Sequence, residues 1–312
     1  MEAKVNADRP LPLKVNVKKR RKFIGSESFY GYLFVSPMMV GFILVMLFPL
    51  VYSIYMSLTD WQLLGDPNFI GTANYQQLIK DPEFFIVLKN TFLFSAGLVP
   101  INIILALWLA MLLQRNLPGM GIFRTAIFIP VMTSIVVWSI IWKYMFGTDE
   151  GFINQILGAI GMEGPAWLYN PRLAMGAVIF VSALKNVGLN MILFLAALQQ
   201  VDKSLYEASY LDGANKWRRF WHITMPMITP TVFLTIILTV IGSMKVFGQI
   251  YVMTNGGPGN HTKVLVYYIW ENAFKLFEFG YASAIAIILF VIILIFTLIQ
   301  WWARKRWVFH EQ

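Results

Sequence analysis

The sequence predicts an all-α integral membrane protein with six transmembrane helices. Of its 312 residues, 58% are hydrophobic and only 13% are charged, whereas about a quarter of the residues in a soluble domain are charged. The mean hydropathy is correspondingly high, at +0.62. The apolar residues also occur in runs long enough to cross about 30 Å of hydrocarbon, which takes about 20 helical residues. These observations exclude the secreted, cytosolic and fibrous classes.

Six apolar runs form the predicted spans, and none of them contains Asp or Glu. Their hydrophobicity does not alternate, so they are helices rather than strands of a membrane barrel. The first run is too long for a cleavable signal peptide and begins after residue 30. We therefore expect one six-span domain over residues 31–303, between a basic tail (1–30) and a short C-terminal tail (304–312). The expected spans are 31–53, 90–114, 122–146, 173–198, 231–253 and 280–303.

The charges between the spans predict the orientation. The two tails and the segments after the second and fourth spans hold 17 Lys and Arg against 7 Asp and Glu, while the opposite side holds 6 against 9. Because positive loops stay in the cytoplasm, both termini are expected there, in a protein of the cell (inner or plasma) membrane. The basic run from Lys18 to Lys22 is interpreted as an anchor on anionic membrane lipid, and nucleic acid is not an expected partner.

Residues for catalysis are nearly absent from the sequence. It has no cysteine, and its three histidines lack a second histidine at metal-binding spacing. No phosphate-binding loop occurs, and no span carries a carboxylate for proton-coupled transport. We expect no catalytic residue, no metal and no cofactor on this chain. It is predicted to form a pathway whose energy comes from other subunits.

The segment after the fourth span, residues 203–226, is the most informative motif. Two short helical patterns meet at Gly213, where a left-handed backbone costs little. The second pattern places Trp217, Phe220 and Trp221 on one face, and Pro226 is expected to stop it before Pro230 opens the next span. Such a helix lies either on the membrane surface or in the groove of a partner protein.

This segment resembles the "EAA" loop of ABC importer permeases, the binding-protein-dependent (MetI-like) family. It departs from the family pattern at Ser209 and Met225. Further stretches resemble the carbohydrate, maltose-type branch, and the resemblance runs from about Tyr32 to Gln300. In the loop, the matching residues are Glu207, Ala208, Asp212, Gly213, Ala214, Ile223 and Pro226. Elsewhere they are Ser36-Pro37, Asn74-Tyr75, Phe128-Ile129-Pro130, Gly151, Ile153-Asn154 and the stretch from Thr254 to Pro258.

The resemblance implies a type I ABC permease subunit that imports a sugar or oligosaccharide. It implies a second permease subunit, usually a different chain, two cytoplasmic ATPase subunits that hold ATP and Mg, and an extracellular solute-binding protein. The residues expected to couple to the ATPase are Glu207, Ala208, Asp212, Gly213, Ala214 and Pro226. The alternatives are an ion-coupled secondary transporter and an ABC permease for an acidic or phosphorylated sugar.

Polar residues within the spans are candidates for the substrate path. Ser182, Asn186 and Asn190 share one face of the fourth span, and Thr235, Thr239 and Ser243 share one face of the fifth. Such rows serve either as hydrogen-bond links between helices or as a path for sugar hydroxyls. The resemblance favours the path, because the maltose-type pocket draws on the corresponding stretches. Trp138 is a candidate stacking platform, with ordinary packing as the alternative.

Lys185 is the least expected residue in these spans, since it lies near mid-membrane. A buried ammonium needs a partner, so it meets backbone carbonyls, cavity water or a carboxylate on the second permease. Alternatively, it lines the path and favours anionic sugars. Lys245 adds little support for this alternative, because on the fifth helix it points about 200° away from Ser243.

Overall fold

The computed structural model describes residues 27–114 and 118–307, and these residues fold into helices joined by turns. Within these ranges the only β-structure is two isolated bridges, Thr59 with Phe69 and Gln62 with Glu278. The all-α prediction is confirmed. The basic run from Lys18 to Lys22 lies outside the described residues. The chain divides into two compact units, Met1–Tyr52 and Ser53–Gln312, which are described separately.

The first unit holds most of one apolar helix, Phe29–Met56, which is long enough to cross a membrane. This continuous helix is made of α1 (Glu27–Phe42), the π-helical turn η1 (Ile43–Leu47) and α2 (Phe48–Met56). The wide π turn ends two residues before Pro49. A proline ring clashes with the carbonyl four residues earlier and lacks a donor, and the wider turn accommodates both within a continuous helix.

The second unit contains thirteen labelled helical segments within its described residues. Four single helices here are long and apolar enough to span a membrane: Pro82–Leu113, Ala174–Gln200, Lys216–Met244 and Phe279–Arg304. The segments are α3 (Ala73–Lys80), α4 (Pro82–Leu113), α5 (Met120–Met132), α6 (Ile135–Met145), α7 (Phe152–Ala159), α8 (Ala174–Gln200), α9 (Lys203–Leu211), α10 (Lys216–Arg219), η2 (Phe220–Thr224), α11 (Met225–Met244), α12 (Gly248–Met253), α13 (Leu265–Phe274) and α14 (Phe279–Trp307).

The apolar run 122–146 is not one continuous helix. It forms α5 and α6, which meet at an angle of 101°. Thr133 and Ser134 take extended conformations at the break, and the N–H of Thr133 turns back to the carbonyl of Pro130. The apolar composition of the run predicted its length and did not predict this bend.

The helix that leads into α11 corrects a second expectation. Pro226 does not stop it, because α10, η2 and α11 form one helix from Lys216 to Met244. As at Pro49, a π-helical turn, Phe220–Thr224, ends two residues before the proline. At its other end the helix stops at Met244 rather than near residue 253, and Lys245 to Phe247 separate it from α12.

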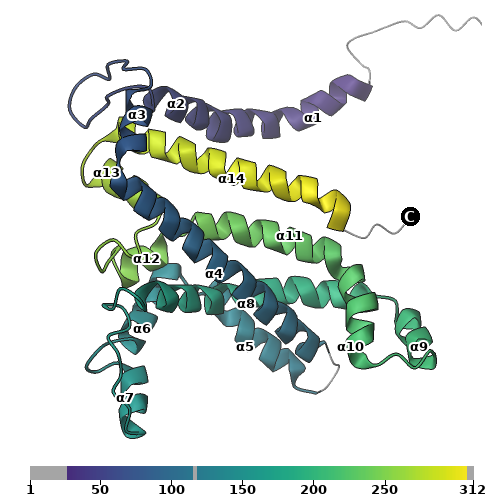
Figure 1. Cartoon of the computed structure of the whole chain (residues 1–312). Coiled ribbons are helices and arrows are strands. Elements are labelled where there is room, and N and C mark those ends of the chain that lie inside the picture. Colours follow the sequence, from purple (N-terminus) through teal and green to yellow (C-terminus); the bar gives the residue numbers. More distant parts are fainter. Residues whose placement is uncertain (1–26, 115–117, 308–312) are drawn as a thin grey trace, which may run out of the picture. The chain divides into compact units, whose positions relative to one another are not determined.

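Helix α8 is the centre of the second unit and packs against α4, α5 and α11. Figure 1 shows α4 crossing α8. Among the candidate spans it is the most buried, with 67% of its most apolar window inside the protein. Gly188 lets α5 approach closely: a Cβ there would lie 2.4 Å from the carbonyl oxygen of Ile127.

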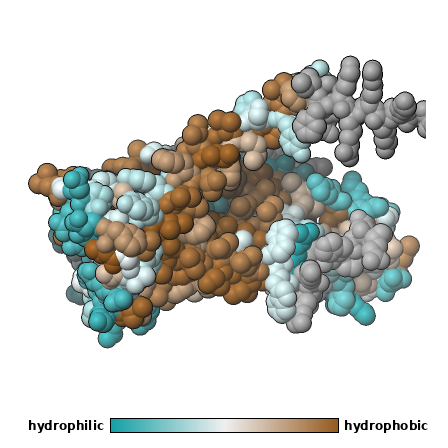
Figure 2. Space-filling view, turned by 90° about the horizontal axis from the view of Figure 1, so that it is seen from above, coloured by the Kyte–Doolittle hydropathy of each residue, from teal (hydrophilic) through white to brown (hydrophobic). Residues whose placement is uncertain are grey.

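On the face shown in Figure 2, hydrophobic residues form a band between hydrophilic ends, as a lipid-facing surface requires.

A polar network ties the loop after α12 to the start of α4. The amide of Asn90 donates to the carbonyls of Asn260 and Lys263. The ammonium of Lys263 pairs with Glu83 and Glu271, and these partners hold its pKa above the ordinary value although burial alone would lower it. This loop is thus held by the folded helices and not by its own turn residues alone.

Asp81, immediately before α4, anchors α13 and α14 in the same way. Its carboxylate accepts hydrogen bonds from the hydroxyls of Tyr268 and Tyr281 and from the N–H of Glu83. Burial is the largest single influence on the pKa of Asp81 and raises it. The hydrogen bonds together outweigh burial and bring the pKa below its ordinary value of 3.8. Asp81 therefore stays charged at neutral pH.

Candidate functional site

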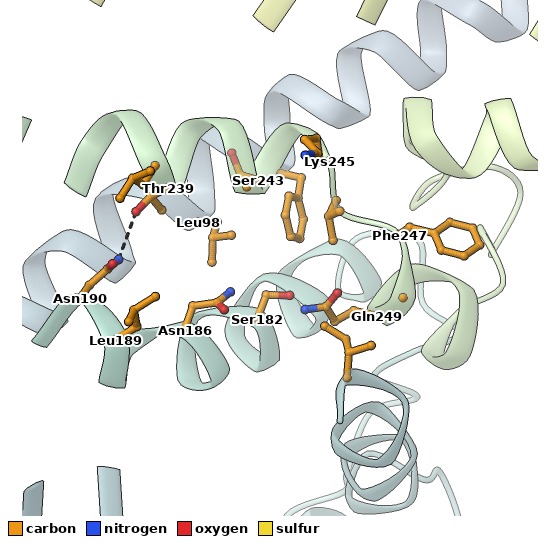
Figure 3. Close-up of a pocket in the computed structure, with 16 residues that line it drawn as sticks. Leu98, Ser182, Asn186, Leu189, Asn190, Thr239, Ser243, Lys245, Phe247 and Gln249 are labelled. Atoms are coloured by element: carbon orange, nitrogen blue, oxygen red, sulfur yellow. Dashed lines mark hydrogen bonds between the residues drawn. The ribbon is translucent and has the colours of Figure 1, made fainter. Parts of the chain in front are cut away.

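A cavity of about 350 Å³ lies between α8 and α11 (Figure 3). This volume is within the range of small-molecule binding sites. Five of the eight candidate path residues line it, whereas Thr235, Lys185 and Trp138 do not. Its other polar lining, Lys245 and Gln249, comes from the segment after α11. The lining comprises Phe94, Leu98, Ile135, Ser182, Asn186, Leu189, Asn190, Leu238, Thr239, Gly242, Ser243, Lys245, Val246, Phe247, Gly248 and Gln249.

The α8 wall carries Ser182, Asn186 and Asn190 at intervals of four residues, which places them on one helix face. Ser182 is buried and donates its hydroxyl to the carbonyl of Val178 at 2.7 Å. Asn186 is exposed and makes no hydrogen bond to any residue that the structure describes. Its amide therefore offers both a donor and an acceptor to a ligand.

The opposite wall comes from α11, where Thr239 and Ser243 face the cavity (Figure 3). The amide of Asn190 donates to the Thr239 hydroxyl at 3.1 Å and also to Asn102 of α4. Ser243 is hydrogen-bonded to Ser95 of α4 at 2.7 Å. The same side chains therefore link the helices by hydrogen bonds and also line the cavity.

Sequence reasoning missed Lys245 and Gln249. Because α11 ends at Met244, the helical angle that placed Lys245 away from Ser243 does not apply. Lys245 lines the cavity beside Ser243, and Gln249 lies below it near Ser182 (Figure 3). Lys245 and Gln249 lie four residues apart, on either side of Gly248, in an otherwise apolar run. This pattern is the sequence signal that could have indicated the break between α11 and α12.

Lys185 and Trp138 do not line the cavity. The ammonium of Lys185 donates to the carbonyls of Pro130 and Thr133, at 2.9 and 2.6 Å. It therefore binds the carbonyls at the C-terminal end of α5, where a positive charge is favoured, and it spans the break between α5 and α6. The indole of Trp138 donates to the carbonyl of Val181 at 3.1 Å, and its ring packs against Trp142. In this structure both residues contact protein groups.

The segment with the EAA-like motif forms α9 and α10. The N–H of Gly213 bonds to the carbonyl of Tyr210, and the N–H of Ala214 bonds to that of Ser209. This pair of bonds is the Schellman motif, which requires a left-handed residue after the helix. Gly213 supplies it with a φ of +71°. Asn215 then caps α10 by accepting the N–H of Arg218. The sharp turn predicted at Gly213 is confirmed.

The surface of α9 and α10 is open. Glu207, Ala208 and Asp212 are exposed, and Tyr210 and Leu211 are 72% and 86% exposed. Glu207 and Tyr210 also line a shallow hollow together with Arg219. Pro226 lies beyond this surface, partly buried inside the continuous helix.

Comparison with known proteins identifies the family. Residues 102–308 match the family of binding-protein-dependent transport system inner membrane components. The chain belongs to this family. Its relatives include the lactose transport system permease LacF of Rhizobium radiobacter, 37% identical over 88% of this chain and 94% of LacF. Another is the arabinooligosaccharide transport system permease AraP of Bacillus subtilis, 33% identical over 93% of each chain.

Membership confirms that the chain is a multi-pass membrane permease component of an ABC transporter. The fold agrees: the chain superposes on a subunit of a bacterial alginate ABC transporter with a TM-score of 0.80, covering 89% of this chain and 95% of that chain at 21% identity. That transporter was crystallised with its periplasmic protein. As a permease of the binding-protein-dependent type, the chain works as part of a larger transporter complex.

Proposed function

We propose that this chain is a permease subunit of a sugar or oligosaccharide importer and that the cavity between α8 and α11 is its part of the sugar path. The main support for this proposal is the set of residue types that line the cavity. Neutral hydroxyls and amides from two facing helices line it together with the aromatic side chain of Phe94. Sugars present many hydroxyls, which need neutral donors and acceptors, and apolar ring faces, which pack on aromatic side chains. LacF and AraP, which are sugar permeases by name, support this substrate class.

The surface of α9 and α10 is proposed to dock on a cytoplasmic ATPase subunit. Tyr210 and Leu211 would enter the partner's groove, while Glu207 would meet a basic group on it. A second permease would bring an equivalent surface, so that two ATPase subunits are bound, and ATP and Mg would lie on those subunits. Both termini are then cytoplasmic, in agreement with the distribution of Lys and Arg.

The test is transport by the purified native complex in proteoliposomes, with its binding protein outside and ATP inside. We expect uptake of at least one glycan from a panel of neutral and acidic oligosaccharides, with a strict need for ATP. Uptake driven by a proton or sodium gradient without ATP would instead support the secondary transporter. Topology is tested separately: a reporter after Gln312 should be cytoplasmic and one near Gly161 external.

A further inference from the structure

The cavity contains one charged side chain, Lys245, and no carboxylate among its described lining residues. Lys245 is exposed, and no hydrogen bond or ion pair joins its ammonium to any part of the chain that the structure describes. The other lysine of these spans differs, because Lys185 is buried against two carbonyls. An ionisable side chain that faces a cavity between membrane helices is a candidate for a ligand or ion site.

A second group at the same place is also without a partner. Gln249 is only 4% exposed, lines the cavity, and makes no hydrogen bond to the described residues. Its amide atoms are not among the buried atoms that lack a partner in the described residues, so they reach the cavity space and can bond to water or a ligand there. Figure 3 shows Gln249 beside Ser182 and Lys245 on the opposite side of the space. This end of the cavity therefore presents an ammonium and an amide, both of which donate hydrogen bonds.

We propose that the cavity binds an anionic sugar whose carboxylate pairs with Lys245 and accepts a hydrogen bond from Gln249. The sugar hydroxyls would lie along Asn186 and Thr239. This assignment rests on the proposed function, since it takes the cavity to be the sugar path, and it adds the charge of the substrate. One lysine matches the single charge of a uronate, whereas a phosphate monoester carries about −1.5 to −2.

The test compares Lys245→Met, Lys245→Arg and the control Lys143→Met in the full complex with its binding protein. Lys143 is exposed at the end of α6 and does not line the cavity, so the control removes the same charge elsewhere. The probes are galacturonate, glucuronate and mannuronate disaccharides, their neutral counterparts that carry a C6 hydroxyl instead of a carboxylate, and glucose 6-phosphate.

We expect the wild type to import at least one uronate, and Lys245→Met to lower that uptake about tenfold or more, the effect of one lost charge-assisted hydrogen bond. Uptake of any neutral disaccharide should change less than about twofold. Lys245→Arg should retain most of the uronate uptake, and Lys143→Met all of it.

Equal losses for uronate and neutral sugar, loss of complex assembly, or no change in Lys245→Met would overturn the assignment. So would wild-type preference for glucose 6-phosphate over every uronate. If the wild type imports neutral disaccharides but no uronate, the sugar importer stands and the anionic assignment falls. If ATP drives uptake of no sugar at all, the proposed function itself fails.

Discussion

Replacing Gly188 by alanine tests the close contact between α8 and α5. A Cβ at this position would lie 2.4 Å from the carbonyl oxygen of Ile127 and 3.1 Å from the Cα of Phe128. Ordinary contact begins at 3.4 Å, so α5 and α8 would have to separate by about 1 Å. Both neighbours are backbone atoms and cannot rotate away.

The expected cost follows from this geometry. Overpacking typically costs about 1–3 kcal/mol, and a clash with rigid backbone falls at the upper end. Alanine regains about 1 kcal/mol over glycine in a helix, so Gly188→Ala should lose about 2 kcal/mol. On the scale of about 2–4 °C per kcal/mol, the apparent melting temperature should fall by roughly 4–8 °C.

Gly176 on the same helix is the matched control. A Cβ there has nothing within 4 Å, so Gly176→Ala should leave the melting temperature unchanged or slightly raised. The assay is the thermal stability of the detergent-solubilised complex, followed by fluorescence-detected size exclusion. If Gly188→Ala is as stable as Gly176→Ala, the close crossing of α5 and α8 is wrong.

Three further perturbations probe the other sites. Gly213→Ala should reduce the co-purification of ATPase subunits and uptake, because a left-handed alanine costs about 1–2 kcal/mol, while Gly213→Asn should do less harm; equal coupling in wild type and Ala variant would refute the docking role. Lys185→Met should lower thermal stability and the uptake of every substrate alike, since the carbonyls of Pro130 and Thr133 lose their donor; a selective loss of acidic-sugar uptake at normal stability would place Lys185 in the path. Asp81→Asn should be less stable than wild type at neutral pH, and because the folded pKa lies below 3.8, the difference should shrink only as pH falls below that value; a pH-independent difference would contradict the charged anchor.

The fold could be predicted because apolar runs of membrane-spanning length, which are its main cause, can be seen directly in the sequence. The path residues on α8 were equally accessible, since Ser182, Asn186 and Asn190 follow helical periodicity on an unbroken helix. The turn at Gly213 was accessible because few residues other than glycine take a left-handed backbone.

The breaks in the helices could not be predicted from the sequence in the same way. At the bend between α5 and α6, Lys185 of another helix donates to the carbonyls of Pro130 and Thr133, a contact that the sequence of the bent run does not contain. Pro226 was expected to end a helix, but a π-helical turn absorbs it. The end of α11 at Met244 turned Lys245 into the cavity, which a continuous helix would have prevented. The π-helical turn accompanies the proline itself, since the same turn precedes Pro49.

The most direct test of the sugar path uses the absence of native cysteine from this chain. Asn186→Cys places a thiol in the cavity, and Ile192→Cys places one on an exposed apolar position of the same helix, outside the cavity lining. A membrane-impermeant, charged thiol reagent should label Asn186→Cys in the transporting complex, and the imported sugar should slow that labelling, while Ile192→Cys should react little with or without sugar. Labelling of Asn186→Cys that is absent, or that the imported sugar does not slow, would contradict the assignment of this cavity to the sugar path.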